Sequence, residues 1–229
     1  MRPEPGDQPS PGRRERWLRA QEHERRYWED RGDPRRALAQ REPRYAQVFA
    51  RVAEQLPGAP RVVDVGSGPT CWGRVFPGMR VYVDPLMASY RARWGDQLPE
   101  GFLLAAAGES LPLRSRSCDL VLSLNAIDHC ADPQAVIREC ARVARPGGLI
   151  AVSVYAHPPL RAALRRLREG LGLGSAPHPL SFTRGTLVRL VERGGLEVLE
   201  VLDLGCVSSR TRPGVLKRRE LLVLGRAPA

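Results

Sequence analysis

The chain has 229 residues, a length that suits one α/β domain with a well-filled core and is too short for two substantial domains. It has no uninterrupted apolar run of about 18 residues, and its N-terminus lacks the apolar stretch of a secretory signal, so we expect a cytoplasmic protein without a membrane-spanning helix. The formal net charge is +11, but the arginines are spread along the chain and only Lys217 is a lysine, so charge alone does not indicate a nucleic-acid-binding protein.

The chain contains five cysteines, an odd number without any paired C-x-x-C spacing. This pattern argues against a disulfide framework and against a structural zinc site. We expect reduced core residues at the five positions, which are Cys71, Cys118, Cys130, Cys140 and Cys206.

The N-terminal quarter is predicted to contain a tail and two helices. Residues 1–13 are rich in proline and charge, and we expect them to be disordered. Residues 14–58 carry apolar and aromatic residues at helical spacing, with a break at Gly32-Asp33-Pro34. We expect two helices here that pack on the main domain, which comprises residues 59–229, and the first helix is alternatively a substrate lid.

Strand-like and helix-like segments alternate through the main domain. The predicted strands are residues 61–65, 80–83, 102–106, 118–124, 149–155, 196–204 and 220–226. Helices are predicted at residues 71–76, 86–94, 133–143 and 183–192. Because such alternation implies right-handed crossovers, we predict an α/β, Rossmann-like, doubly wound sheet of seven mostly parallel strands. A loop instead of a helix joins the last two strands, which predicts an antiparallel C-terminal hairpin.

The stretch from Arg61 to Pro69 organises this domain. A β-branched apolar run leads into two spaced glycines, Gly66 and Gly68, which is typical of a buried parallel strand that ends in a tight turn where a ligand contacts the backbone. Asp84 follows the next strand-like run. Because a carboxylate there can accept both hydroxyls of a ribose lying across the strand ends, the pattern predicts an adenosine-type ligand.

A lid-like insertion at residues 157–179 separates the fifth strand from the last helix. Its apolar stripe consists of Leu160, Leu164, Leu167 and Leu171. Its other side carries Arg161, Arg165, Arg166 and Arg168. The pattern favours a covering helix with a solvated basic face, and the alternatives are an anionic-substrate clamp or a peripheral contact with anionic lipid through residues 160–171.

Six motifs, in their expected order, resemble those of class I S-adenosylmethionine-dependent methyltransferases. The group they most resemble is the small-molecule, methyltransferase type 11 group that includes ubiquinone and menaquinone methylases. The motifs are Val62–Gly68, Tyr82–Asp84, Glu109–Leu113 with Cys118–Val121, Asn125–His129 with Asp132-Pro133, Arg142–Gly148, and His178–Thr183. The resemblance covers roughly residues 44–226 and implies S-adenosyl-L-methionine as the cofactor.

The resemblance also implies the cofactor-binding residues, which are Asp64, Gly66, Ser67, Gly68, Asp84, Pro85, Gly108, Glu109 and Asn125. Two positions depart from the family pattern. Thr70 replaces a third glycine, and Ala107 replaces an acid that contacts adenine in the family. The missing hydrogen bond is expected to weaken adenine recognition by about 1 kcal/mol, which main-chain groups of Gly108 and Glu109 can offset.

The predicted reaction is methyl transfer to oxygen or nitrogen of a small-molecule acceptor. Positioning and desolvation supply much of the acceleration, and a base is needed only where the acceptor must lose a proton. Histidine suits that role. We expect His178 to be the base or an acceptor ligand, and His129 to be either a second candidate base or a residue that packs behind the cofactor. Tyr155, His157 and Arg161 are expected to bind the acceptor.

Several other chemistries are less favoured by the sequence. Asp128 and Asp132 alone do not make a magnesium site, so no metal is predicted. No N-P-P-Y or D-P-P-Y tetrad and no Pro-Cys pair follows the fourth strand, which argues against methylases of nucleic-acid bases.

Three alternatives to a small-molecule methyltransferase stay open. An RNA methyltransferase is supported by the net charge and by Lys217-Arg218-Arg219. An NAD(P)-dependent oxidoreductase is possible because Gly66-Ser67-Gly68 begins a dinucleotide fingerprint, although Cys71 occupies the position of the third glycine. The third alternative is a non-catalytic relative that binds S-adenosylmethionine.

Overall fold

The computed structural model describes residues 11–170, 180–206 and 218–229. The α-helices of these residues are α1 (Pro11–Arg31), α2 (Pro34–Ala53), α3 (Met87–Trp94), α4 (Pro133–Val143), α5 (Pro159–Gly170) and α6 (Arg184–Arg193). The strands are β1 (Arg61–Val65), β2 (Met79–Val83), β3 (Phe102–Leu104), β4 (Cys118–Leu124), β5 (Ala144–Ala156), β6 (Glu197–Cys206) and β7 (Arg219–Arg226). Short 3₁₀ turns are η1 (Trp72–Val75), η2 (Gly95–Gln97) and η3 (Ile127–His129).

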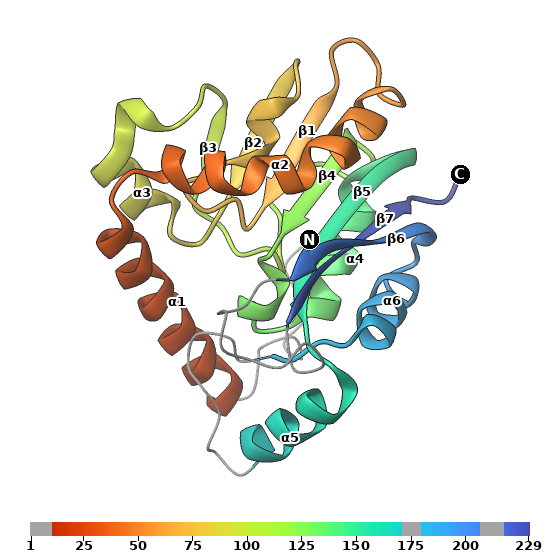
Figure 1. Cartoon of the computed structure of the whole chain (residues 1–229). Helices are drawn as coiled ribbons and strands as arrows, with labels where there is room; N and C mark the ends of the chain where they lie inside the picture. Colours follow the sequence, from red (N-terminus) through yellow and green to blue (C-terminus); the bar gives the residue numbers. More distant parts are fainter. Residues whose placement is uncertain (1–10, 171–179, 207–217) are drawn as a thin grey trace.

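The described strands form one seven-stranded sheet in the order β3-β2-β1-β4-β5-β7-β6 (Figure 1). The pairs from β3 through to β5 are parallel, and β7 runs antiparallel between β5 and β6. The predicted fold class, with its antiparallel C-terminal hairpin, is therefore confirmed. The chain moves outward from β1 to β3 and then returns to β4 on the other side of β1. This reversal creates a crevice beyond the carboxyl ends of β1 and β4, where ligands of open α/β sheets bind.

Helices cover both faces of the sheet. On one face, α2 packs Tyr45, Phe49 and Val52 against a cluster that includes Val62 of β1. On the other face, α4 and α6 pack against a cluster that includes Val63 of β1. Figure 1 shows α2 crossing in front of the central strands, with α4 behind them. Because successive strand residues point to opposite faces, a strand covered on both sides must be apolar at almost every position, as β1 and β4 are.

Local sequence explains where two of the helices begin. An aspartate precedes each one and a proline is its first residue, and the aspartate accepts hydrogen bonds from main-chain N–H groups of the first turn. Asp33 accepts from the N–H of Arg35 at 2.8 Å at the start of α2. Asp132 accepts from the N–H of Gln134 at 2.9 Å at the start of α4. The predicted helix start at Pro133 is therefore confirmed.

The fifth strand begins earlier than the sequence predicts. It starts at Ala144 instead of residue 149, because Ala144 pairs with Cys118 of β4 and a register shift follows that pair. The turn residues Gly147 and Gly148 are also held by main-chain hydrogen bonds of 3.0 and 2.9 Å with Ala227, beyond the end of β7. Pairing of Ala144 with β4 and of the turn with Ala227 thus includes these residues in β5.

The cysteine prediction is wrong for one residue. Three of the five thiols are buried, at Cys71, Cys118 and Cys140, and Cys130 is half-buried. Cys206 is exposed because it ends β6, the outer strand of the sheet. All five are free thiols.

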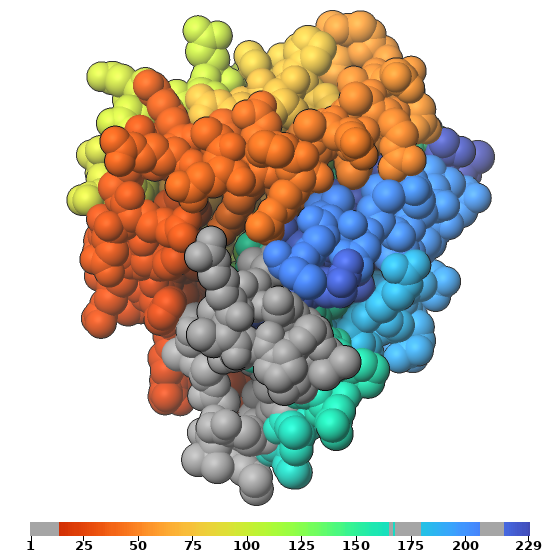
Figure 2. All heavy atoms as spheres, viewed as in Figure 1, coloured from red at the N-terminus to blue at the C-terminus, as the bar shows by residue number. Residues whose placement is uncertain are grey.

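The insertion contains helix α5, whose leucine stripe does not pack on the domain in the described residues. The side chains of Leu160, Leu164 and Leu167 are 71%, 56% and 62% exposed. Ala162 on the same helix is fully buried. Leu171 lies outside the described residues. Figure 2 shows α5 at the lower edge of the molecule, and α1 and α2 forming the left and upper parts of the same face.

No helix of the described residues has the length and apolar character needed to cross a membrane.

Candidate functional site

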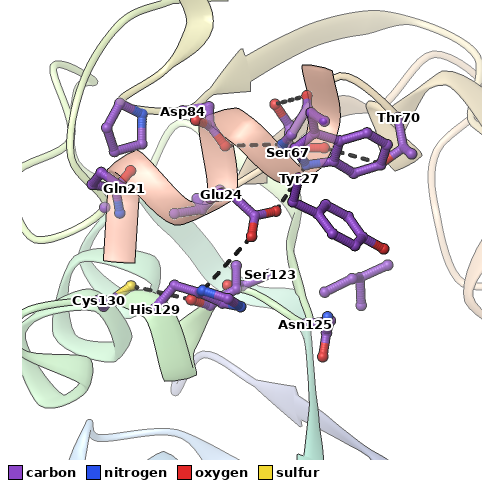
Figure 3. A pocket seen from close by; sticks show the side chains of 18 of the residues that line it. Gln21, Glu24, Tyr27, Ser67, Thr70, Asp84, Ser123, Asn125, His129 and Cys130 are labelled. Carbon is purple, nitrogen blue, oxygen red and sulfur yellow. Dashed lines mark hydrogen bonds and ion pairs between the residues drawn. The ribbon is translucent and has the colours of Figure 1, made fainter. Parts of the chain in front are cut away.

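A cavity of about 460 Å³ lies at the carboxyl ends of the central strands, where the chain order reverses. The loops after β1, β2, β3 and β4 line it, and so do helices α1 and α2. Figure 3 shows helix α1 lying across the labelled side chains that line the cavity. The predicted residues that line the cavity are Gly66, Ser67, Gly68, Asp84, Pro85, Gly108, Glu109, Asn125, His129 and Tyr155.

The turn after β1 needs glycine at its first position. Gly66 has a φ of +68°, and a Cβ atom there would lie 2.4 Å from the Cβ of Ala126. Its N–H donates to the carbonyl of Val83 on β2 at 2.8 Å, which fixes the turn against the neighbouring strand. The strand-to-turn geometry therefore leaves main-chain atoms, without side chains, along the cavity wall.

Thr70, which departs from the family pattern, fits into this turn. Its side chain is buried, and its hydroxyl donates to the carbonyl of Ser67 at 3.2 Å. The left-handed conformation that a glycine would favour is adopted by the next residue, Cys71, with a φ of +50°. The turn therefore closes through a side-chain hydrogen bond.

Asp84 connects the glycine turn to the end of β2. One carboxylate oxygen accepts from the N–H of Gly68 at 2.9 Å, and the other accepts from the N–H of Leu86 at 2.8 Å. The side chain is almost fully buried, and burial raises the pKa of Asp84 to about 6, although both hydrogen bonds favour the ionised form. At neutral pH the carboxylate is therefore mostly ionised and its remaining lone pairs can accept hydrogen bonds from a ligand.

Asp64 has a different position from the other predicted cofactor residues, since it does not line this cavity. It is 1% exposed on β1 and accepts from the N–H of Gly73 in η1 at 2.9 Å. Burial raises the pKa of Asp64 to about 7. Its observed contact stabilises the turn that follows the glycines.

The end of β4 presents two buried polar atoms without a hydrogen-bond partner among the described residues. They are the hydroxyl oxygen of Ser123 and the side-chain oxygen of Asn125. Asn125 has a φ of +55°, and its N–H donates to both the carbonyl and the hydroxyl of Ser153, at 2.9 and 3.1 Å. Because buried polar groups are nearly always paired in folded proteins, these two atoms mark where a ligand would donate hydrogen bonds.

Glu109 lines the cavity but uses one carboxylate oxygen to hold a neighbouring loop. That oxygen accepts from the N–H groups of Ala131 and Asp132 at 2.7 and 3.2 Å. The loop after β3 is thereby tied to the segment after β4. At the neighbouring Gly108, an added Cβ atom would lie only 2.9 Å from the side chain of Val65, so a larger residue would not fit there without a shift.

Helix α1 supplies a residue that the sequence did not single out. One carboxylate oxygen of Glu24 accepts from the indole N–H of Trp28 at 2.8 Å, and the other lies 3.9 Å from Nδ1 of His129 (Figure 3). The second nitrogen of His129, Nε2, lies 3.7 Å from Asp128. Glu24 therefore connects the N-terminal helix to the segment after β4. No sequence pattern marks it, because α1 is rich in charge on every side.

The predicted acceptor residues do not all lie together. Tyr155 lines the cavity, whereas His157 and Arg161 do not. His157 is buried, and its main-chain N–H donates to the carbonyl of Phe182 at 2.7 Å. His178 lies outside the described residues. His23 is exposed and also lines the cavity.

Within the described ranges, no group of three or more His, Cys, Asp and Glu side chains is arranged to hold a metal ion.

Comparison with known proteins gives a consistent result. Residues 63–152 match a family model described as a methyltransferase domain. An uncharacterized methyltransferase of Mycobacterium sp. (strain KMS) is 37% identical over 111 residues, which are 47% of this chain and 44% of that protein. This chain therefore spans less than half the length of that relative. Methyltransferase GfsG of Streptomyces halstedii is 29% identical over 195 residues, 78% of this chain and 69% of that protein.

Solved structures share the fold. The crystal structure of a putative methyltransferase from Bacillus halodurans C-125 superposes with a TM-score of 0.62 and 16% identity, covering 80% of this chain and 98% of that one. At this level of identity the likeness concerns the fold.

Proposed function

We propose that this chain, which carries a class I methyltransferase domain, transfers a methyl group from S-adenosyl-L-methionine to an oxygen or nitrogen of a small-molecule acceptor. The resemblance to class I S-adenosylmethionine-dependent methyltransferases that the sequence predicts is confirmed, and with it the cofactor of that family. The terminal hairpin is also not typical of NAD(P)-dependent oxidoreductases.

One observation carries the proposal. The open glycine turn, the carboxylate of Asp84 and the two unpaired oxygens of Ser123 and Asn125 lie along one cavity at the topological switch point. These groups fit the parts of S-adenosylmethionine in order. Asp84 would accept the ribose hydroxyls, main-chain atoms at Gly66 and Gly68 would contact the methionine part, and the two oxygens would accept from its ammonium group. The bound cofactor supplies an activated methyl group on a sulfonium.

The protein's contribution to methyl transfer is mainly positioning and exclusion of water. Tyr155 of β5 lines the cavity, which supports its predicted contact with the acceptor. Both ring nitrogens of His129 face carboxylates, Nδ1 that of Glu24 and Nε2 that of Asp128. This arrangement favours a positioning role for His129 over a role as the base. His178 stays the predicted base for acceptors that must lose a proton.

Calorimetric titration with S-adenosylhomocysteine tests the proposal directly. The wild-type protein is expected to bind it with one site, and Gly66→Val is expected to lose binding because a branched side chain would fill the turn against Ala126. Absence of binding by the wild type, or equal binding by Gly66→Val, would overturn the proposal. Gly147→Val, at a turn where nothing lies within 4 Å of an added Cβ, is the matched control.

RNA is kept as a second acceptor class because the chain carries a net charge of +11. An RNA-binding protein of this charge would bind transfer RNA with an affinity that falls steeply as salt rises. Absence of such salt-dependent binding near neutral pH would leave the small molecule as the acceptor.

The peripheral lipid contact through residues 160–171 also stays a prediction. The exposed leucines of α5 support it, because they offer an apolar surface.

A further inference from the structure

Three arginines line the cavity. They are Arg31 at the end of α1, Arg41 on α2, and Arg218 just before β7. Among the described residues, none of the three forms a hydrogen bond or ion pair with a carboxylate. A cluster of cationic side chains without anionic partners, on the wall of a cavity, is an arrangement that an anionic ligand would complete.

Two tyrosines lie beside these arginines. The guanidinium of Arg31 lies 4.8 Å from the centre of the Tyr27 ring, and that of Arg218 lies 5.4 Å from the centre of the Tyr155 ring. Arg41 lies within electrostatic range of both tyrosines. The two cation–π contacts orient the outer guanidinium groups without neutralising their charge.

Arg41 is half-buried. Burial alone would disfavour its charged form, but Tyr155, Tyr27, Tyr45 and the buried carboxylate of Glu220 outweigh that effect, and the pKa of Arg41 is raised. Glu220 itself is occupied, since it accepts from Tyr45 and lies 3.4 Å from Arg44. Arg41 therefore stays charged without a direct carboxylate partner in the described residues.

The acids of the cavity lie elsewhere and are already engaged. Asp84 accepts from main-chain N–H groups of Gly68 and Leu86, and Glu24 accepts from Trp28 and lies near His129. Within the described residues, the arginines beside Tyr27 and Tyr155 therefore have no carboxylate partner among these acids. The part of a ligand that approaches these arginines should carry negative charge.

We propose that the cluster of Arg31, Arg41 and Arg218 on the cavity wall binds a carboxylate or phosphate group of the acceptor, and that Tyr27 and Tyr155 flank the apolar body of that acceptor. This inference rests on the proposed function, because it assigns the substrate class of the same cavity. It narrows the acceptor to anionic small molecules. The carboxylate of the cofactor's methionine part offers the same chemistry, so the test must separate the two sources.

The test uses phenyl phosphate as the anionic probe and benzyl alcohol as its neutral counterpart. Both are titrated calorimetrically into the full chain, with and without S-adenosylhomocysteine. We expect phenyl phosphate to bind at least about tenfold more tightly than benzyl alcohol, since hydrogen bonds to charged groups are the strong ones. Arg41→Gln and Arg218→Gln are each expected to weaken phenyl phosphate binding about tenfold or more and to leave benzyl alcohol binding unchanged. Arg138→Gln, an exposed site on α4, is the control for net charge.

A second pair of titrations separates acceptor from cofactor. S-adenosylhomocysteine has a carboxylate, and 5′-methylthioadenosine does not. If the arginines serve the acceptor, the variants bind both compounds as the wild type does. If Arg41→Gln and Arg218→Gln both weaken S-adenosylhomocysteine alone and leave phenyl phosphate binding unchanged, the arginines serve the cofactor and the inference is overturned.

The inference can also fail while the proposed function stands. Suppose that the protein binds S-adenosylhomocysteine but has equal affinity for phenyl phosphate and benzyl alcohol. This result would overturn the inference of an anionic acceptor and leave the proposed function standing. Phenyl phosphate is also titrated without S-adenosylhomocysteine. A chain that failed to bind S-adenosylhomocysteine would therefore still show whether the three arginines bind an anion. Thermal unfolding of each variant identifies any loss of binding that is caused by misfolding.

Discussion

The main-chain N–H of Gly68 donates a hydrogen bond to the carboxylate of Asp84, with 2.9 Å between the nitrogen and the oxygen. The contact joins the turn after β1 to the end of β2, two places that the sequence separates but the parallel sheet brings side by side. The glycine turn and the carboxylate therefore act as one unit. Changes at either residue are expected to affect the ligand contacts of the other.

Replacing Asp84 by Asn is expected to weaken binding of S-adenosylhomocysteine about tenfold or more. An amide is a poorer acceptor than a carboxylate, and hydrogen bonds to charged groups contribute about 1.5–3 kcal/mol. Calorimetric titration at pH 7.5 measures the effect. Asp96→Asn, in the exposed turn η2, is the control and should bind like the wild type. Equal affinities for Asp84→Asn and the wild type would remove Asp84 from the ribose site.

The raised pKa of Asp84 predicts opposite pH trends for ligand binding and for stability. Binding of S-adenosylhomocysteine should strengthen as pH rises through about 6, because only the ionised carboxylate accepts two ribose hydroxyls well. In the absence of ligand, the stability of the fold changes in the opposite direction and falls as pH rises. A carboxyl with a raised folded-state pKa contributes stability that is full below its unfolded value of 3.8 and is lost as pH rises through about 6.

These trends are measured by calorimetry and by urea unfolding at pH values between about 4 and 8. Asp84→Asn should flatten the binding trend. Glu24 and His129 also act on Asp84, so Glu24→Gln and His129→Gln should shift the midpoint of the transition without abolishing it. A binding profile that Asp84→Asn leaves unchanged would assign the transition to another group.

Gly66→Ala is expected to destabilise the protein more than Gly147→Ala. Both residues have a positive φ, +68° and +72°, so both substitutions incur a backbone cost of about 1–2 kcal/mol. Only at Gly66 does the added Cβ also collide, at 2.4 Å from Ala126. Urea unfolding of the two variants should therefore show a larger loss for Gly66→Ala. Equal losses of unfolding free energy would mean that the segment after β4 moves and accommodates the new methyl group.

Glu220→Gln is expected to lower the free energy of unfolding by about 1–3 kcal/mol. The carboxylate of Glu220 is fully buried; it accepts from the hydroxyl of Tyr45 and from that of Ser153, the latter at 3.5 Å. Ser153 in turn accepts from the N–H of Asn125 in the cavity. The variant should therefore also reduce affinity for S-adenosylhomocysteine.

Asp203→Asn is the matched control for Glu220→Gln. Asp203 pairs with Arg219, whose side chain is half exposed, and surface ion pairs contribute at most about 1 kcal/mol. If both variants unfold at the same urea concentration, the buried network of Glu220 contributes no more than a surface pair.

Glu24→Ala is expected to loosen helix α1 over the cavity. The substitution removes the acceptor for Trp28 and the contact with His129. Amide hydrogen exchange measured by mass spectrometry should then be faster in α1 and unchanged in β4. Glu15→Ala is the control, because Glu15 pairs only with Arg19 among the described residues and both side chains are exposed. Faster exchange in both variants would point to helix propensity as the cause.

Local sequence was sufficient to predict the scaffold of the site. The β-branched run into Gly66 and Gly68, the position of Asp84 after the next strand, and the Asp-Pro helix start at Asp132 each depend on a few neighbouring residues. Turn geometry, strand burial and helix capping are set by such short-range chemistry. The order of these signals along the chain then predicted the doubly wound sheet and its terminal hairpin.

Only the tertiary structure revealed the rest of the site. Glu24 on α1 and Arg41 on α2 lie far in the sequence from Arg218, which precedes β7, and packing brings the three side chains to one cavity. Packing also places His157 beside Phe182 and away from that cavity, and it leaves Leu164 of α5 exposed. Charged and amphipathic helices carry no local signal of the surface they face. Which of their residues contact a ligand is decided by contacts between segments far apart in the chain, and those contacts exist only in the folded protein.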